Sequence, residues 1–257
     1  MDGLIRRKKS GSGNSKSHSK SKEVSIPIKT KGKLGKQIVV IDCPDKKFDE
    51  KWFKGRNIGN LPKPYRAVLF GVPNCGKSTY VKNLLLNADP PFDTLTIVGC
   101  SDDTTDFKDL EPSIVLDTLP SLDSFDRSKK NALVIDDWKA KNPADKARLD
   151  RLFGFVSSHC NTTIIMCLQD IFALHSPTIR RMCNVFVLWK NADKRQNLLV
   201  EPRVGLEKGT IDNLMRDLDF GKRDSLMIDL TPHTPAPLRK NLFDKIKTDF
   251  VPDLPTG

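Results

Sequence analysis

From residue 65 onward, short continuous apolar runs alternate with longer segments in which apolar side chains recur every three or four positions. The apolar runs that predict strands cover residues 65–70, 95–99, 113–116, 132–136, 162–168, 184–189 and 225–230. The segments that predict helices cover residues 79–87, 145–158, 171–182 and 211–218. Strands that are apolar throughout and separated by helices are typical of a parallel sheet with both faces covered. The pattern therefore predicts an α/β domain.

The two ends of the chain have a different pattern. Residues 1–36 are rich in Ser, Lys and Gly and predict a disordered tail. Residues 37–64 predict one short strand and an approach segment to a domain that covers 65–230. The last part, 231–257, begins with a Pro-rich stretch, which predicts a connector followed by a short tail helix.

A glycine-containing run directly follows the first predicted strand and precedes the first predicted helix. It matches G-x-x-x-x-G-K-[ST], the phosphate-binding P-loop, and consists of Gly71, Val72, Pro73, Asn74, Cys75, Gly76, Lys77, Ser78 and Thr79. The two glycines let the backbone fold tightly and point its N–H groups at phosphate oxygens. Lys77 can reach the β- and γ-phosphates, and the Ser78 hydroxyl can ligate Mg²⁺. The run therefore predicts nucleotide binding.

Polar residues at the ends of two later strands can complete this site. Asp136 and Asp137 follow the apolar run Leu133–Ile135, as the acids of a Walker B motif do. Asp136 is predicted to hold Mg²⁺, and Asp137 to orient or deprotonate the attacking water. Gln169 ends the next strand, from which an amide can reach the γ-phosphate. Turn formation or helix capping is the alternative explanation for two aspartates at a strand end.

The arginines that follow Gln169 are candidates for a catalytic arginine finger. Arg180 and Arg181 lie in the next predicted helix, and either one could stabilise charge during phosphoryl transfer, in its own subunit or in a neighbouring one. Arginines on a helix surface are the alternative. The sequence leaves both choices open.

The segment between Lys77 and Asp136 contains at least one further strand, so the P-loop strand and the Walker B strand need not be neighbours. This insertion, with a strand ending in glutamine after Walker B, indicates a P-loop NTPase with a RecA-like sheet, of the additional-strand (ASCE) class. The guanine-reading sequence N-K-x-D is absent, which favours ATP over GTP.

The ordered motifs resemble one family over about residues 62–200. The P-loop, the run Leu133–Asp137, the run Thr163–Gln169 and Ser176–Arg180 are similar to those of viral genome-packaging ATPases of the FtsK–HerA superfamily, nearest to poxvirus-type, virophage and Polinton-like proteins. The resemblance implies a ring, with a hexamer favoured, that hydrolyses ATP between subunits and drives double-stranded DNA into a capsid. It also implies a capsid or portal-vertex protein as partner.

Charge is concentrated at one end of the chain. The formal net charge is +11, of which residues 1–36 carry +9, so the remaining chain carries +2. The basic tail could be a nuclear-import signal, a nonspecific DNA contact or a solubilising segment. The domain itself has no recognisable DNA-gripping loop and no basic stripe in its sequence.

Other features narrow the setting. The six cysteines form no C-x-x-C pair and predict reduced thiols in an intracellular protein. The resemblance implies the host nucleus or a viral factory in an infected cell, with the virion as a further option. No apolar run approaches the roughly 18 residues of a membrane helix, so no membrane partner is expected. Three alternatives to a packaging motor stay open: a replicative helicase, a nucleotide-dependent protein that binds a packaging signal with little turnover, and a nucleotide kinase.

Overall fold

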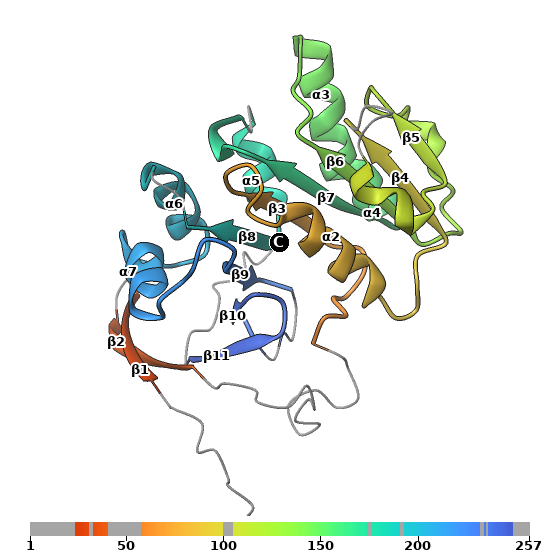
Figure 1. The fold of residues 1–257 in the computed structure, drawn as a ribbon. Helices are drawn as coiled ribbons and strands as arrows, with labels where there is room; N and C mark the ends of the chain where they lie inside the picture. Colours follow the sequence, from red (N-terminus) through yellow and green to blue (C-terminus); the bar gives the residue numbers. More distant parts are fainter. Residues whose placement is uncertain are drawn as a thin grey trace, which may run out of the picture.

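The computed structural model describes residues 24–30, 33–40, 58–99, 105–173, 176–190, 193–231, 234 and 236–248. Within these ranges the chain forms one large mixed sheet with helices on its two faces (Figure 1). No helix in this part of the chain is long and apolar enough to cross a bilayer.

Six parallel strands form the half of the sheet that contains the P-loop strand. Their order is β8–β3–β7–β6–β4–β5. Their bounds are β3 Arg66–Phe70, β4 Thr94–Val98, β5 Ile114–Leu116, β6 Asn131–Asp136, β7 Thr162–Leu168 and β8 Val185–Trp189. All six were predicted from their apolar runs. The P-loop strand β3 is separated from β6 by β7, as the further strand between Lys77 and Asp136 allowed.

The other half of the sheet is antiparallel and continues from β8 through β9, β10, β11 and β2 to β1. These strands are β1 Val24–Thr30, β2 Lys33–Val40, β9 Ser225–Asp229, β10 Leu238–Lys240 and β11 Asp244–Thr248. The predicted tail helix is therefore wrong, because the chain after residue 237 forms β10 and β11, which extend the sheet beyond β9. The predicted disorder of residues 1–36 is also wrong over β1 and the start of β2, whose alternating apolar positions suit a hairpin; residues 1–23 lie outside the described ranges.

Helices and short helical turns connect the strands. Their bounds are α2 Lys77–Leu86, η1 Thr105–Leu110, η2 Leu122–Ser124, α3 Pro143–Arg151, the π-helical turn η3 Leu152–Val156, α4 Ser157–His159, η4 Ile171–Ala173, α5 Pro177–Met182, α6 Arg195–Val200, η5 Glu201–Arg203 and α7 Thr210–Asp217. The prediction of one helix over 171–182 is wrong. Ser176 is extended before Pro177, a position where proline disfavours the helical conformation, and its side chain caps the new helix α5.

The core lies on both faces of the sheet, because successive strand residues point to opposite sides. On one face, α2 packs through Val81 and Leu84 against side chains that include Leu69 of β3. On the other face, the α3–η3 segment and α7 pack through residues such as Phe153 and Leu214. The predicted coverage of both faces by helices is confirmed.

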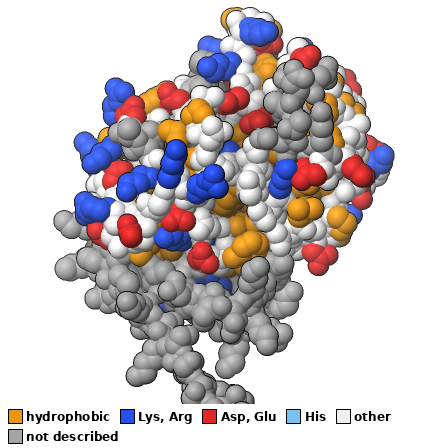
Figure 2. Space-filling model, in the orientation of Figure 1, with side chains coloured by type: hydrophobic (Ala, Val, Ile, Leu, Met, Phe, Trp, Pro, Cys, Tyr) orange, Lys and Arg blue, Asp and Glu red, His pale blue; other side chains and the backbone are white. Residues whose placement is uncertain are grey.

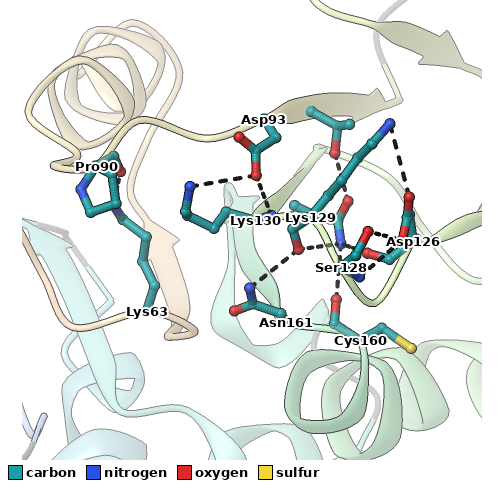
Figure 3. Close-up of polar contacts among 11 residues, drawn as sticks. Lys63, Pro90, Asp93, Asp126, Ser128, Lys129, Lys130, Cys160 and Asn161 are labelled. Carbon is teal, nitrogen blue, oxygen red and sulfur yellow. Dashed lines mark hydrogen bonds and ion pairs between the residues drawn. The ribbon is translucent and has the colours of Figure 1, made fainter.

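Hydrogen bonds from side chains fix the starts of several parallel strands relative to one another (Figure 3). The Asp93 carboxylate, just before β4, accepts a hydrogen bond from the Lys130 backbone N–H at 2.7 Å. The Asn131 amide at the start of β6 donates to the carbonyls of Asp126 at 2.8 Å and Cys160 at 2.9 Å. These bonds fix the starts of β4, β6 and β7, and their opposite ends are thereby aligned at the other edge.

A buried ion pair joins two antiparallel strands. Arg239 Nη2 lies 2.6 Å from Asp229 Oδ2, and both side chains are 0% exposed. Arg239 also donates to the carbonyls of Ala236 and Ile58, so the pair ties β9 and β10 to the segment that precedes β3. Breaking such a pair from one side leaves an uncompensated charge in the core.

We therefore expect Arg239→Met to lower the free energy of unfolding by about 3–5 kcal/mol, because the Asp229 carboxylate loses its buried partner. Chemical denaturation followed by circular dichroism measures the change. Arg216→Met, which breaks an exposed ion pair with Asp217, is the matched control and should leave stability nearly unchanged. Equal losses of unfolding free energy in the two variants would contradict the view that the buried Arg239–Asp229 pair stabilises the core.

Candidate functional site

The predicted P-loop joins the end of β3 to the start of α2. The Gly71 N–H donates to the carbonyl of Leu168 at 3.2 Å, which ties the loop to the end of β7. Asn74 and Gly76 have positive φ angles of 60° and 110°, so the backbone doubles back before the helix begins. A left-handed turn of this kind requires residues that tolerate positive φ. The loop thus has the strand–loop–helix arrangement of a P-loop.

Lys77 is held inside the loop. Its Nζ donates to the carbonyl of Gly71 at 2.8 Å and to that of Val72 at 3.2 Å, and the side chain is buried. Ser78 follows in the first turn of α2, whose first N–H groups and dipole favour an anion. A cation, a hydroxyl and free backbone donors are therefore gathered at one helix start.

The other loop residues determine the backbone conformation of the loop or pack against the core. Val72, Gly76 and Ser78 are half-buried, Gly71, Cys75 and Lys77 are buried, and Pro73, Asn74 and Thr79 are exposed. A Cβ on Gly71 would lie 2.8 Å from the Cys75 sulfur and 2.9 Å from Cβ of Trp189, so only glycine fits there. Burial raises the pKa of the Cys75 thiol above its ordinary value, which suits a packing residue and disfavours a nucleophile.

The polar residues of the two neighbouring strand ends meet at the same edge. Asp136 ends β6 and pairs in register with Cys167 of β7. Asp137 has a φ of 46°, and its N–H donates to the Cys167 carbonyl at 3.1 Å. The Gln169 side-chain nitrogen donates to Asp137 Oδ2 at 2.5 Å. Two residues that are 32 positions apart in the sequence are therefore coupled directly, and both are exposed to solvent.

Gly99 positions the backbone of Asp136 and thereby the two aspartates Asp136 and Asp137. No motif in the sequence pointed to this glycine. It follows β4, has a φ of 92°, and lies so close to Asp136 that a Cβ would collide with the Asp136 carbonyl oxygen. The backbone of Asp136 can lie against β4 only because residue 99 has no side chain. A glycine directly after an apolar strand was the available signal, but it does not distinguish this close approach from an ordinary turn.

The two candidate finger arginines are placed away from this chain's own P-loop. Helix α5, which carries Arg180 and Arg181, packs on the face opposite α2. Its last turn lies at the starts of β3 and β8, where the Arg66 guanidinium donates to the Met182 carbonyl at 3.2 Å and the Asn184 N–H donates to the Arg66 carbonyl at 3.0 Å. The P-loop begins at the far end of β3, about 13 Å along the strand.

The residues present fit a magnesium ion held jointly with phosphate. Among the described residues no group of three or more His, Cys, Asp or Glu side chains could form a complete metal cage. Mg²⁺ needs less from the protein, because it binds through one or two oxygen ligands together with substrate phosphates and water. The Ser78 hydroxyl and the Asp136 carboxylate are oxygen ligands of this kind. Both belong to elements that end or begin at the P-loop edge.

Similar folds occur among solved nucleotide-dependent proteins. The chain is similar to the genome packaging NTPase B204 from Sulfolobus turreted icosahedral virus 2 in complex with ATP-gammaS, with 13% identity, a TM-score of 0.48, and coverage of 70% of this chain and 98% of that one. It is also similar to the pCW3 conjugation coupling protein TcpA in its monomer form with ATPgS, with 12% identity, a TM-score of 0.46, and coverage of 88% and 76%. No protein-family model matches the chain. No curated protein matches it either.

A second set of residues at the P-loop was also missed by the sequence analysis. A cleft of 610 Å³ runs from the loop to residues that follow β10 or precede β9, among them Arg223, Asn241 and Phe243. These positions carry no motif, and they reach the P-loop only because β9 and β10 pair beside β8.

The contact at Gly99 gives a testable consequence. Gly99→Ala is expected to lower the free energy of unfolding by clearly more than Gly209→Ala, because both glycines have positive φ but only Gly99 is pressed against backbone. The left-handed conformation alone should cost Gly209→Ala about 1–2 kcal/mol. Chemical denaturation of both variants measures the difference. Equal losses would mean that Asp136 is not held through Gly99.

Proposed function

We propose that this chain is an ATP-hydrolysing motor that translocates double-stranded DNA and packages a viral genome into a capsid. The observation that carries the hydrolytic part is the contact of Asp137 with Gln169 at the strand ends beside the P-loop. A nucleotide-binding loop needs only phosphate ligands, whereas a carboxylate coupled to an amide at this edge adds groups that can act on water.

The residues divide between binding and chemistry. Lys77 and the start of α2 bind the phosphates of ATP as substrate, and the P-loop backbone fixes their position. Ser78 and Asp136 would hold Mg²⁺, which would neutralise charge on the transferred phosphoryl group. Asp137 takes the proton from the attacking water, since its carboxylate is exposed at the strand ends beside the P-loop. The Gln169 amide orients the carboxylate and the water through its donor and acceptor atoms.

The position of α5 supports hydrolysis between subunits. Arg180 and Arg181 lie on the other face of the sheet from α2 and near its other edge, so they are better placed for a neighbouring chain's nucleotide than for their own. A heterologous contact that repeats this relation builds a ring when its rotation closes. A ring of this chain, with a hexamer favoured, is therefore part of the proposal.

The DNA and packaging parts rest mainly on the resemblance of the ordered motifs. The basic residues 1–36, with their charge of +9, can add sequence-independent attraction to phosphates. On the face drawn in Figure 2, Lys and Arg side chains are interspersed with Asp and Glu, so the described residues of that face form no stripe of one sign. A capsid or portal-vertex protein as partner, and action in the host nucleus or a viral factory, belong to the same proposal.

One alternative keeps the nucleotide site but removes turnover. A nucleotide-dependent protein that binds a packaging signal would need the P-loop, but it would not need Asp137 and Gln169 to be in contact. A replicative helicase or a nucleotide kinase would keep both, and would differ by unwinding a fork or by using a phosphate acceptor other than water.

Steady-state ATP hydrolysis with and without long double-stranded DNA tests the proposal. We expect duplex DNA to stimulate the wild-type rate, and both Lys77→Ala and Asp137→Asn to lower kcat by about 10²–10³-fold or more, because each removes a group that acts on the transferred phosphoryl or the water. Lys208→Ala removes the charge of a surface lysine outside the site. It is the control for the loss of a positive charge.

The outcomes separate the candidates. Nucleotide binding with no turnover under any DNA condition would favour the packaging-signal binding protein. Turnover that ignores DNA but needs a second phosphate acceptor would favour a kinase. Stimulation by a forked duplex with strand separation, and none by blunt duplex, would favour a helicase.

A further inference from the structure

The cleft at the P-loop extends from the loop itself to the side away from the hydrolytic residues. It measures 610 Å³ and is lined by the loop residues 74–79, by the next turn of α2, by Trp189 at the end of β8, and by Arg223, Asn241 and Phe243. A volume of this size falls within the range of about 300–1,000 Å³ that small-molecule sites occupy.

Strand order gives the direction in which a nucleotide must lie. β7 and β6, which carry Gln169 and Asp137, lie on one side of β3, whereas β8 and β9 lie on its other side. The terminal phosphate has to reach Asp137 and Gln169, because these are the groups that can act on water. The opposite end of the same nucleotide then points across β3 toward β8 and β9, where the cleft is.

The floor of the cleft is rigid and aromatic. The rings of Tyr80 and Trp189 meet edge to face, with centroids 5.7 Å apart. The Trp189 ring nitrogen donates to the Arg223 carbonyl at 3.2 Å, which fixes the backbone that carries this arginine. Both rings are buried, so the floor cannot move aside without opening the core.

The turn between β10 and β11 is fixed by Asn241. Asn241 has a φ of 59°, its N–H donates to the Ser225 carbonyl at 2.6 Å, and its side-chain oxygen accepts from the Ser225 N–H at 3.1 Å. The Tyr80 hydroxyl donates to the Asn241 carbonyl at 3.3 Å. The turn is thereby attached to both β9 and α2, and it presents the half-buried ring of Phe243 at the wall.

Arg223 presents its guanidinium at the wall of the cleft. Its guanidinium makes no hydrogen bond or ion pair with any residue in the described part of the chain, although its backbone carbonyl is bound by Trp189. It lines the cleft and is exposed. A planar guanidinium in such a place can stack on a flat ring as well as donate hydrogen bonds.

We infer that this cleft binds the purine base of the nucleotide, with Phe243 and Arg223 contacting the base and Asn241 positioning the turn. The inference rests on the proposed function, because it is the phosphate end of the nucleotide that sets the direction. It adds a specificity site built from the C-terminal strands, far in sequence from the P-loop. Flat aromatic and guanidinium surfaces favour a purine over a pyrimidine, since the larger ring system stacks over more area.

Calorimetric titration of the full chain with ADP and with inorganic pyrophosphate, both in magnesium, tests this assignment. ADP should bind the wild type more tightly than pyrophosphate does, because only ADP carries a base. Phe243→Leu, which keeps an apolar side chain against Ile58, and Arg223→Ala should each weaken ADP about fivefold or more and leave pyrophosphate unchanged. Lys222→Ala removes a neighbouring exposed charge outside the cleft and is the matched control.

Two results would overturn the inference alone. One is wild-type affinity for ADP in both cleft variants, and the other is an equal loss of ADP and pyrophosphate. Lys77→Ala separates this failure from a failure of the proposed function, because it should lose both ligands. If Lys77→Ala bound both ligands normally, the phosphate site and the proposal built on it would fail together.

Discussion

The position of β3 between β7 and β8 is the constraint on which the rest of the site depends. Parallel strands bring their carboxyl ends to one edge, so the P-loop after β3 and the polar ends of β6 and β7 meet there. The register of the strands also decides which single backbone hydrogen bonds join the loops to β7. The Gly71 N–H is bound to the end of β7, and so is the Asp137 N–H. Because β7 holds both neighbours, the phosphate-binding loop and the acidic pair share one rigid support, and Gln169 extends from that same strand.

The sequence was sufficient where the physical signal was local. The six parallel strands are largely apolar runs, including β5 at the exposed edge, so all six were predicted, and the P-loop spacing identified the loop that β3 carries. It was insufficient where pairing partners are distant. Residues 238–240 and 244–248 are short and polar, and they become strands only by extending the edge at β9. For the same reason no pattern showed that Arg223 and Phe243 would reach the P-loop. Ser176-Pro177 did carry a local signal, the helix break that splits 171–182, but apolar periodicity concealed it.

The two ends of the parallel strands hold different parts of the proposed chemistry. The carboxyl ends carry Lys77, Asp137 and Gln169, whereas the last turn of α5 brings Arg180 and Arg181 toward the strand starts on the other face. The starts are fixed by side-chain bonds such as those of Asn131, so the separation is built into the fold. A long flexible side chain cannot remove it. The proposal therefore pairs the nucleotide site of one copy with an arginine of another.

The central claim is that one chain's arginine completes another chain's site, and mixing two inactive variants tests it most directly. Lys77→Ala removes the phosphate ligand, and Arg180→Ala, or Arg181→Ala in a parallel experiment, removes the finger. Lys77→Ala alone, and the variant of whichever arginine is the finger alone, should hydrolyse ATP far more slowly than the wild type in the presence of duplex DNA. Mixed in equal amounts, they should regain a substantial part of the wild-type rate with one of the two arginine variants, because some contacts then pair an intact P-loop with an intact arginine. Co-assembly of the two variants without any recovery, or full activity of both arginine variants alone, would contradict the account.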